Sequence, residues 1–141
     1  MTLRFLLAFA PLISVAQQQS PPARTVSFVT TEGTWVSLDV SRDGREIVFE
    51  LLGDVYVIPR AGGVARAVLT GRAFQSQPRY SRDGRHLAYV SDESGSDNVW
   101  IAGIDGSTPR QVTHLRRATV LSPEWSADGA STRSYARPTS W

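Results

Sequence analysis

The chain has 141 residues, of which 41% are hydrophobic and 20% are charged, values that are typical of a globular protein and exclude a disordered tail. It contains no cysteine, which excludes disulfide bonds and thiolate metal sites. All 15 basic residues are arginine, and they are spread among 13 acidic residues to give a net charge of +2, so the composition does not predict a nucleic-acid surface.

The first part of the chain has the pattern of a secretion signal. Arg4 supplies a positive start, residues 5–13 are apolar, and residues 14–16 form a small-x-small cleavage site. The apolar run is shorter than the roughly 20 residues that a membrane-spanning helix needs. We therefore predict a signal peptide over residues 1–16, cleaved after Ala16, and a periplasmic or secreted protein without a stable membrane anchor.

Residues 17–34 read as a linker, rich in proline and glutamine at its start, with a candidate N-terminal strand. From residue 35 onward, short runs of β-branched and aromatic residues alternate with turn residues, which predicts an all-β protein. The expected strands are residues 36–40, 46–51, 54–58 and 66–70, then 77–80, 86–90, 98–102 and 110–113, with 122–125 opening a third unit.

A turn sequence recurs along this region. Ser-Arg-Asp-Gly-Arg occupies residues 41–45 and again 81–85, and Ser-Ala-Asp-Gly occupies residues 126–129. Aspartate can accept a hydrogen bond from a backbone N–H two residues on, and glycine accepts a positive φ. Four strands in a unit of 40 to 45 residues are typical of a propeller blade.

The repeat also sets expectations for single positions. The residue before each turn serine, namely Val40, Tyr80 or Trp125, is expected to pack on a neighbouring sheet. Tyr80 and Trp125 are also expected to begin equivalent strands. The turn glycines are expected at equivalent positions in the three units. They are Gly44, Gly84 and Gly129.

The run of Ser-x-Asp-Gly, an apolar strand, a Val-Tyr/Trp-Val/Ile strand and Leu/Val-Thr resembles the WD40-like PD40 repeat of TolB-type propellers. The resemblance covers residues 35–129 and implies four-stranded antiparallel blades of a six-bladed propeller, incomplete here. The proline that is common in the family after the turn serine is replaced by Arg42, Arg82 and Ala127. Residues 30–41 and 94–101 also resemble the propeller of exported proteins that carry an amidohydrolase domain downstream.

The last residues, 130–141, depart from the repeat. The unit calls for an apolar strand after the third turn, whereas this segment is polar and contains Arg133, Arg137 and Pro138. We interpret it as an atypical or truncated C-terminal tail, and the chain as part of a longer protein.

No residue pattern predicts a catalytic, cofactor or metal site. His86 and His114 lack the His-x-His spacing of an amidohydrolase metal centre, and His86 is expected at a strand edge on the surface. Residues 92–98 are acidic but lack the ligand spacing of a calcium loop, so a hairpin tip is predicted. Residues 114–117 could bind an anion, but an inter-blade loop is favoured. No serine lies in a Gly-x-Ser-x-Gly motif.

Four aromatic side chains are expected to face the core and not to form a stacking platform for sugars or bases. They are Tyr56, Tyr89, Trp100 and Trp125.

These observations predict a non-catalytic propeller segment of an exported protein that scaffolds, gates access or contacts a protein. The resemblance places it N-terminal to an amidohydrolase-type hydrolase. Two alternatives stay open: a stand-alone envelope module of the TolB kind that binds proteins, and the propeller of a prolyl-oligopeptidase-like or tricorn-like peptidase. The expected partner is a protein or a downstream hydrolase domain, with no nucleic acid and no cofactor. The isolated chain is expected to be marginally stable or oligomeric, because its outer blade faces would lack neighbours.

Overall fold

The computed structural model describes Gly33 and residues 36–139, all within one compact unit of the chain. The predicted signal peptide, its cleavage site and nearly all of the linker lie outside the described residues. The described part is built of ten β strands. No helix long and apolar enough to cross a membrane occurs in it.

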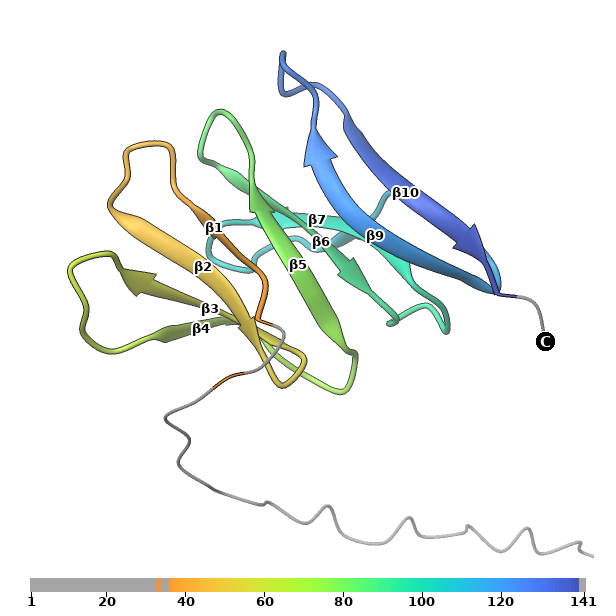
Figure 1. Ribbon diagram of the computed structural model, residues 1–141, viewed down its shortest axis with the longest axis horizontal. Helices are drawn as coiled ribbons and strands as arrows, with labels where there is room; N and C mark the ends of the chain where they lie inside the picture. The colour runs from red at the N-terminus through yellow and green to blue at the C-terminus, as the bar shows by residue number, and fades with distance from the viewer. Residues whose placement is uncertain (1–32, 34–35, 140–141) are drawn as a thin grey trace, which may run out of the picture. The chain divides into compact units, whose positions relative to one another are not determined.

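The strands form three antiparallel sheets in which neighbours in the chain are neighbours in space (Figure 1). The first sheet consists of β1 (Leu38–Val40), β2 (Glu46–Leu51), β3 (Asp54–Pro59) and β4 (Arg66–Leu69). The second consists of β5 (Gln75–Tyr80), β6 (His86–Ser91), β7 (Asn98–Gly103) and β8 (Arg110–Gln111). The third contains β9 (Ala118–Trp125) and β10 (Thr132–Pro138). Two complete four-stranded blades and the first two strands of a third confirm the predicted architecture.

The two complete blades differ mainly in the hairpin between their second and third strands. Leu52 and Gly53 connect β2 to β3 with positive φ values of 56° and 86°, which is the geometry of a tight two-residue hairpin turn. In the second blade, residues 92–97 separate β6 from β7. The acidic segment therefore forms the predicted hairpin tip.

Two apolar cores join the sheets. The first contains Val48 and Val57 from the first sheet with Tyr80, Leu87 and Tyr89 from the second. The second core contains three valines, two from the second sheet and one from the third. These are Val90, Val99 and Val120. The second sheet is therefore covered on both faces, as stacked blades require.

The residues before the turn serines differ from expectation in two respects. Tyr80 and Trp125 end β5 and β9, because the strands extend N-terminally from them and the turn begins at the next residue. Tyr80 is buried and Trp125 is half-buried, but Val40 is 43% exposed. No described sheet covers the face of the first blade on which Val40 lies, so its burial was predicted wrongly.

The polar segment after the third turn forms a strand that its composition did not predict. Strand β10 pairs with β9 from Thr132 opposite Trp125 to Pro138 opposite Ala118, with an irregularity before Tyr135. Apart from Thr132, its residues are exposed. Backbone pairing therefore holds this strand while its polar side chains remain in water.

Substitution of a turn glycine tests the backbone geometry directly. Gly84 has a φ of +69°, and a Cβ atom there would meet nothing within 4 Å. Gly84→Val should therefore lower the free energy of unfolding by about 1–3 kcal/mol through backbone strain alone. Gly84→Asn is the matched control, because asparagine tolerates positive φ, and it should lose much less. Urea unfolding measures both, and equal stability of Gly84→Val and the wild type would contradict this geometry.

Candidate interaction sites between the blades

The three Ser-x-Asp-Gly turns share one hydrogen-bond network. In the first turn, the Ser41 hydroxyl donates to Asp43 Oδ1 at 2.7 Å and accepts a hydrogen bond from the Glu46 N–H at 2.9 Å. Asp43 Oδ1 also accepts from the Arg45 N–H at 3.1 Å. The same bonds recur around Asp83 and Asp128. Each turn therefore begins the second strand of its blade with its polar groups satisfied.

These bonds make the turn aspartates stronger acids. The serine hydroxyl, and after it the backbone N–H two residues on, holds the pKa of Asp43 below its ordinary value. The same two groups lower the pKa of Asp83 and of Asp128. All three carboxylates are therefore charged near neutral pH, and they give this end of the blades fixed negative charges.

Arginine at the second turn position links neighbouring blades. Arg42 Nη1 donates a hydrogen bond of 3.0 Å to the carbonyl oxygen of Arg82, the equivalent residue of the next turn. Proline, which is common at this position in the TolB-type repeats that the sequence resembles, has no donor for such a bond. Arginine at this position thus adds a contact between consecutive turns.

Charged residues also line the first strands of the three sheets, which lie side by side (Figure 1). The residue two before each turn serine is Asp39, Arg79 or Glu124. Asp39 Oδ2 accepts a hydrogen bond from the Tyr80 N–H at 2.9 Å, and Arg79 Nε lies 3.5 Å from Glu124 Oε1. Arg79 Nη1 also donates to the carbonyl oxygen of Leu38 at 3.3 Å. We call these three residues the first-strand ladder; its alternating charges connect all three units.

Two positive-φ residues in the first strands are held by side chains of the preceding unit. Gln77 has a φ of 53° beside an irregularity in β5, and its N–H donates to the Glu50 carboxylate. Ser122 has a φ of 51° at the equivalent place in β9, and its N–H donates to Gln77 Oε1 at 2.6 Å. Because a bulge leaves an N–H unpaired, these side chains supply the missing acceptors.

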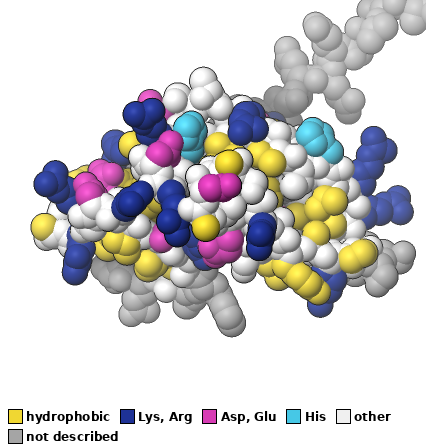
Figure 2. All heavy atoms as spheres, turned by 90° about the horizontal axis from the view of Figure 1, so that it is seen from above, with side chains coloured by type: hydrophobic (Ala, Val, Ile, Leu, Met, Phe, Trp, Pro, Cys, Tyr) yellow, Lys and Arg dark blue, Asp and Glu magenta, His cyan; other side chains and the backbone are white. Residues whose placement is uncertain are grey.

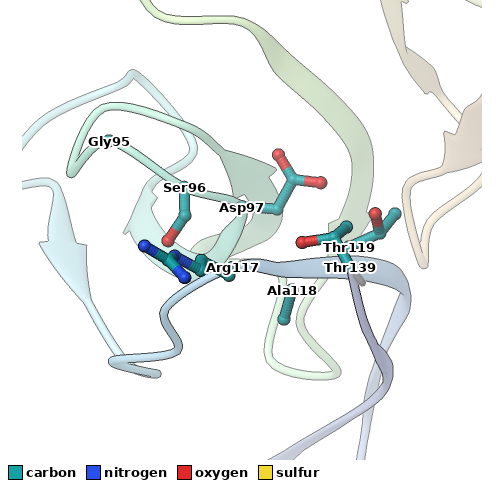
Figure 3. A pocket seen from close by; sticks show the side chains of 7 residues that line it. All are labelled: Gly95, Ser96, Asp97, Arg117, Ala118, Thr119 and Thr139. Atoms are coloured by element: carbon teal, nitrogen blue, oxygen red, sulfur yellow. The ribbon is translucent and has the colours of Figure 1, made fainter. Parts of the chain in front are cut away.

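A hollow of about 660 Å³ opens between the second and third sheets at the β6–β7 tip. Its lining includes Ser96, Asp97 and Arg117, and Figure 3 shows the Asp97 carboxylate and the Arg117 guanidinium on separate sides of it. The carbonyl oxygen of Arg117 accepts a hydrogen bond of 2.9 Å from the Thr139 N–H. The predicted inter-blade loop and the acidic tip therefore meet here, in a hollow whose opposite charges favour no single ionic ligand.

The tip itself is held by Asn98, which is 1% exposed. Its Oδ1 accepts hydrogen bonds from the Leu115 N–H at 2.7 Å and the Thr113 hydroxyl at 2.9 Å. Its Nδ2 donates to the carbonyl oxygens of Ser96 and Leu115. Asn98 thus ties the hairpin to the loop that leads to the next blade.

The two histidines lie apart (Figure 2). His86 is the exposed first residue of β6, as predicted, and its Nδ1 lies 3.8 Å from Asp83 Oδ1. His114 is exposed in the loop between β8 and β9. Over Gly33 and residues 36–139, no group of three or more His, Asp or Glu side chains is arranged to hold a metal ion.

The four aromatic residues expected in the core are buried to different degrees. Tyr89 is 2% exposed, and burial raises its pKa to about 12. Tyr56, Trp100 and Trp125 are half-buried. Trp125 Nε1 donates a hydrogen bond of 3.1 Å to the carbonyl oxygen of Arg79, so the indole fixes the third unit to the second. On the face seen in Figure 2, arginines are dispersed among acidic and apolar side chains.

Similarity to known proteins decides the type of propeller. No family model matches the chain. A solved structure assigned as TolB from Agrobacterium tumefaciens superposes on 77% of this chain and 40% of its own, with a TM-score of 0.66 and 22% sequence identity. The chain has the TolB-like β-propeller fold.

Curated relatives of different kinds match parts of this chain. The chain is 31% identical to the Tol-Pal system protein TolB of Desulfotalea psychrophila over 55% of this chain and 18% of that protein. It is 30% identical to Tricorn protease homolog 1 of Streptomyces coelicolor over 61% of this chain and 8% of that protein. It is 37% identical to the uncharacterized peptidase YuxL of Bacillus subtilis over 43% of this chain and 9% of that protein. The chain therefore spans less than a quarter of each relative.

The contacts between TolB-like blades were not identified from the sequence. A signal for the first-strand ladder was present, because Asp39, Arg79 and Glu124 are all charged at one repeat position. The partners of Glu50 and Gln77 had no such signal, because they depend on how the strands of one blade register against the next.

Acidic pH should reduce the stability that the turn aspartates contribute to the folded chain. The pKa of each turn aspartate is lowered in the folded chain, so its contribution to stability is complete above pH 3.8 and is lost as the pH falls through the lowered values. The urea midpoint should therefore be lower at about pH 3 than at about pH 5. A triple Asp43→Asn, Asp83→Asn, Asp128→Asn variant should show a smaller difference. An unchanged pH dependence in that variant would show that other groups cause the loss.

Proposed function

We propose that these blades are a non-catalytic module of an exported protein, and that they scaffold, or gate access to, a hydrolase domain of the same parent. The observation that carries this proposal is the variety of the relatives. A TolB, a tricorn protease homologue and an uncharacterized peptidase each match part of this chain. Because a segment that resembles proteins of different kinds cannot itself account for functions that differ, it is best explained as a surface that holds or contacts other domains.

Two kinds of parent hydrolase fit this role. An amidohydrolase parent is supported by the sequence resemblance of residues 30–41 and 94–101. A peptidase parent is supported by the similarity to the tricorn protease homologue and to YuxL, each of which is much longer than the matched repeats. The coding sequence beyond residue 141 separates them, since it would encode His-x-His in the first case and Gly-x-Ser-x-Gly in the second. A stand-alone module of the TolB kind would encode neither.

The interfaces between neighbouring blades, which we call seams, present charged side chains that suit this role. The first-strand ladder presents Asp39, Arg79 and Glu124 along adjacent strands, and Glu124 keeps 63% of its side chain exposed. In a closed ring of blades, the strands that approach one another most closely line the central channel. A gate in this position would act on the charge and size of what enters the channel.

The activity test uses the purified chain with divalent metal added. It should hydrolyse no amide or ester above background, while it should co-purify with the remainder of its parent when the two are expressed as separate chains. Turnover that disappears in His86→Ala or His114→Ala would contradict the non-catalytic role. Failure to associate with the parent's remaining domains would contradict the scaffolding role.

Export is tested by the N-terminus of the mature protein. Expressed with residues 1–16 in a Gram-negative host, the chain should be recovered from the periplasm with a mass that begins near Gln17. An Arg4→Glu variant should be exported less efficiently, because it removes the positive charge that precedes the apolar run. An intact Met1 in the cytoplasm would contradict the export assignment.

A further inference from the structure

A hollow of about 570 Å³ lies where the first two Ser-Arg-Asp-Gly turns meet, and we call it the first-turn hollow. Carboxylates from three positions line it, namely Asp43, Glu46 and Asp83. Tyr80 and Ile104 line it as well, and both pack on the first apolar core. The hollow is therefore an acidic opening over an apolar base, formed by two blades together.

The three carboxylates differ in whether they already have hydrogen-bond partners within the protein. Asp43 and Asp83 each accept the hydrogen bonds of their own turn and stay ionised. Glu46 Oε1 and Oε2 have no hydrogen-bond or ion-pair partner within residues 36–139. Arg42 also lines the hollow, but its Nη1 donates to the Arg82 carbonyl oxygen. The Glu46 carboxylate therefore forms no ion pair in the described part of the chain, although the charge of Arg66 also acts on Tyr80, where it partly offsets the rise in pKa that burial causes.

The Tyr80 hydroxyl provides a second, independent indication of a ligand. Tyr80 is 9% exposed, and its hydroxyl oxygen is buried without a hydrogen-bond partner in the described part of the chain. Burial, and next to it the Glu46 carboxylate, raises the pKa of Tyr80 to about 12. Buried polar groups of native proteins almost always have a partner, so an unpaired phenol beside an unpaired carboxylate marks a place for an incoming donor.

An equivalent hollow lies between the second and third sheets, but different side chains line it. Its volume is about 450 Å³, and it contains the equivalents of three of these residues, with Asp83 in place of Asp43, His86 in place of Glu46 and Trp125 in place of Tyr80. Arg110 lines it too. The free carboxylate and the phenol are thus particular to the first-turn hollow, whereas the opening itself belongs to the repeat.

We propose that the first-turn hollow binds an arginine side chain of a protein partner, with Glu46 as the principal carboxylate and Tyr80 as an additional acceptor. A planar guanidinium donates several hydrogen bonds at once, which suits acceptors placed on two blades. The proposal rests on the proposed function as a protein-contacting module, and it names the chemistry that such a partner presents.

The test titrates the full chain, labelled with ¹⁵N, with N-acetyl-arginine amide at low ionic strength. Amide shifts should be confined to the two turns around Gly44 and Gly84, to Glu46 and to Ile104, with a dissociation constant of about 1 mM, the weak affinity expected of a single side chain. N-acetyl-citrulline amide, which is neutral and nearly isosteric, should cause no comparable shifts. Equal shifts with citrulline, or none up to about 20 mM arginine amide, would overturn the proposal.

Matched variants locate the site. Glu46→Gln should weaken arginine binding by about three- to fivefold, and Tyr80→Phe by about twofold, each with a well-dispersed spectrum that shows an intact fold. His86→Glu copies the Glu46 chemistry into the second seam and should produce new shifts at Gly129. Wild-type affinity in Glu46→Gln would overturn the proposal.

The Glu46→Gln variant also distinguishes failure of this binding site from failure of the proposed function. If Glu46→Gln weakens arginine binding as expected but still associates fully with the parent's remaining domains, the hollow is not their contact, and the partner assignment is overturned while the scaffolding role stands. If wild type binds arginine amide but associates with no parent domain, the scaffolding role fails and the site stands.

Discussion

Burial of both faces of a sheet is the constraint on which this structure depends. In β6, four consecutive side chains are almost completely buried, from Leu87 to Val90, although successive residues of a strand point to opposite faces. A sheet with two apolar faces is stable only between two others. Because sheets twist, a stack of small antiparallel sheets turns about an axis, and the propeller arrangement follows from this packing.

Polar contacts then fix how each sheet sits on the one before it. The Tyr80 N–H is bonded to Asp39, the Gln77 N–H to Glu50, and the Ser122 N–H to Gln77. These side chains belong to the preceding unit, so each first strand is positioned by its neighbour. The core residues can therefore stay alike from unit to unit, while seam positions such as Glu46 and His86 differ and give each seam its own chemistry.

The turns and strands could be predicted because their causes are local. Ser-x-Asp-Gly determines its own hydrogen bonds, and the run of β-branched and aromatic residues between two turns placed the second strand at residues 46–51, where β2 is found. Strand β10 escaped prediction because backbone pairing with β9 holds it without apolar burial. The exposure of Val40 and the role of Glu50 depend on which sheet lies opposite, which a single sequence does not encode locally.

Contact between the first two sheets is tested most directly by nuclear Overhauser effects in the ¹³C,¹⁵N-labelled chain. The ring protons of Tyr80 should show cross-peaks to the methyl groups of Val48, Val55 and Val57, which share the first apolar core with it. Such cross-peaks would join residues of consecutive repeats across the seam. Cross-peaks from Tyr80 that are limited to its own sheet, with the valines intact and assigned, would contradict the stacking of these units as blades.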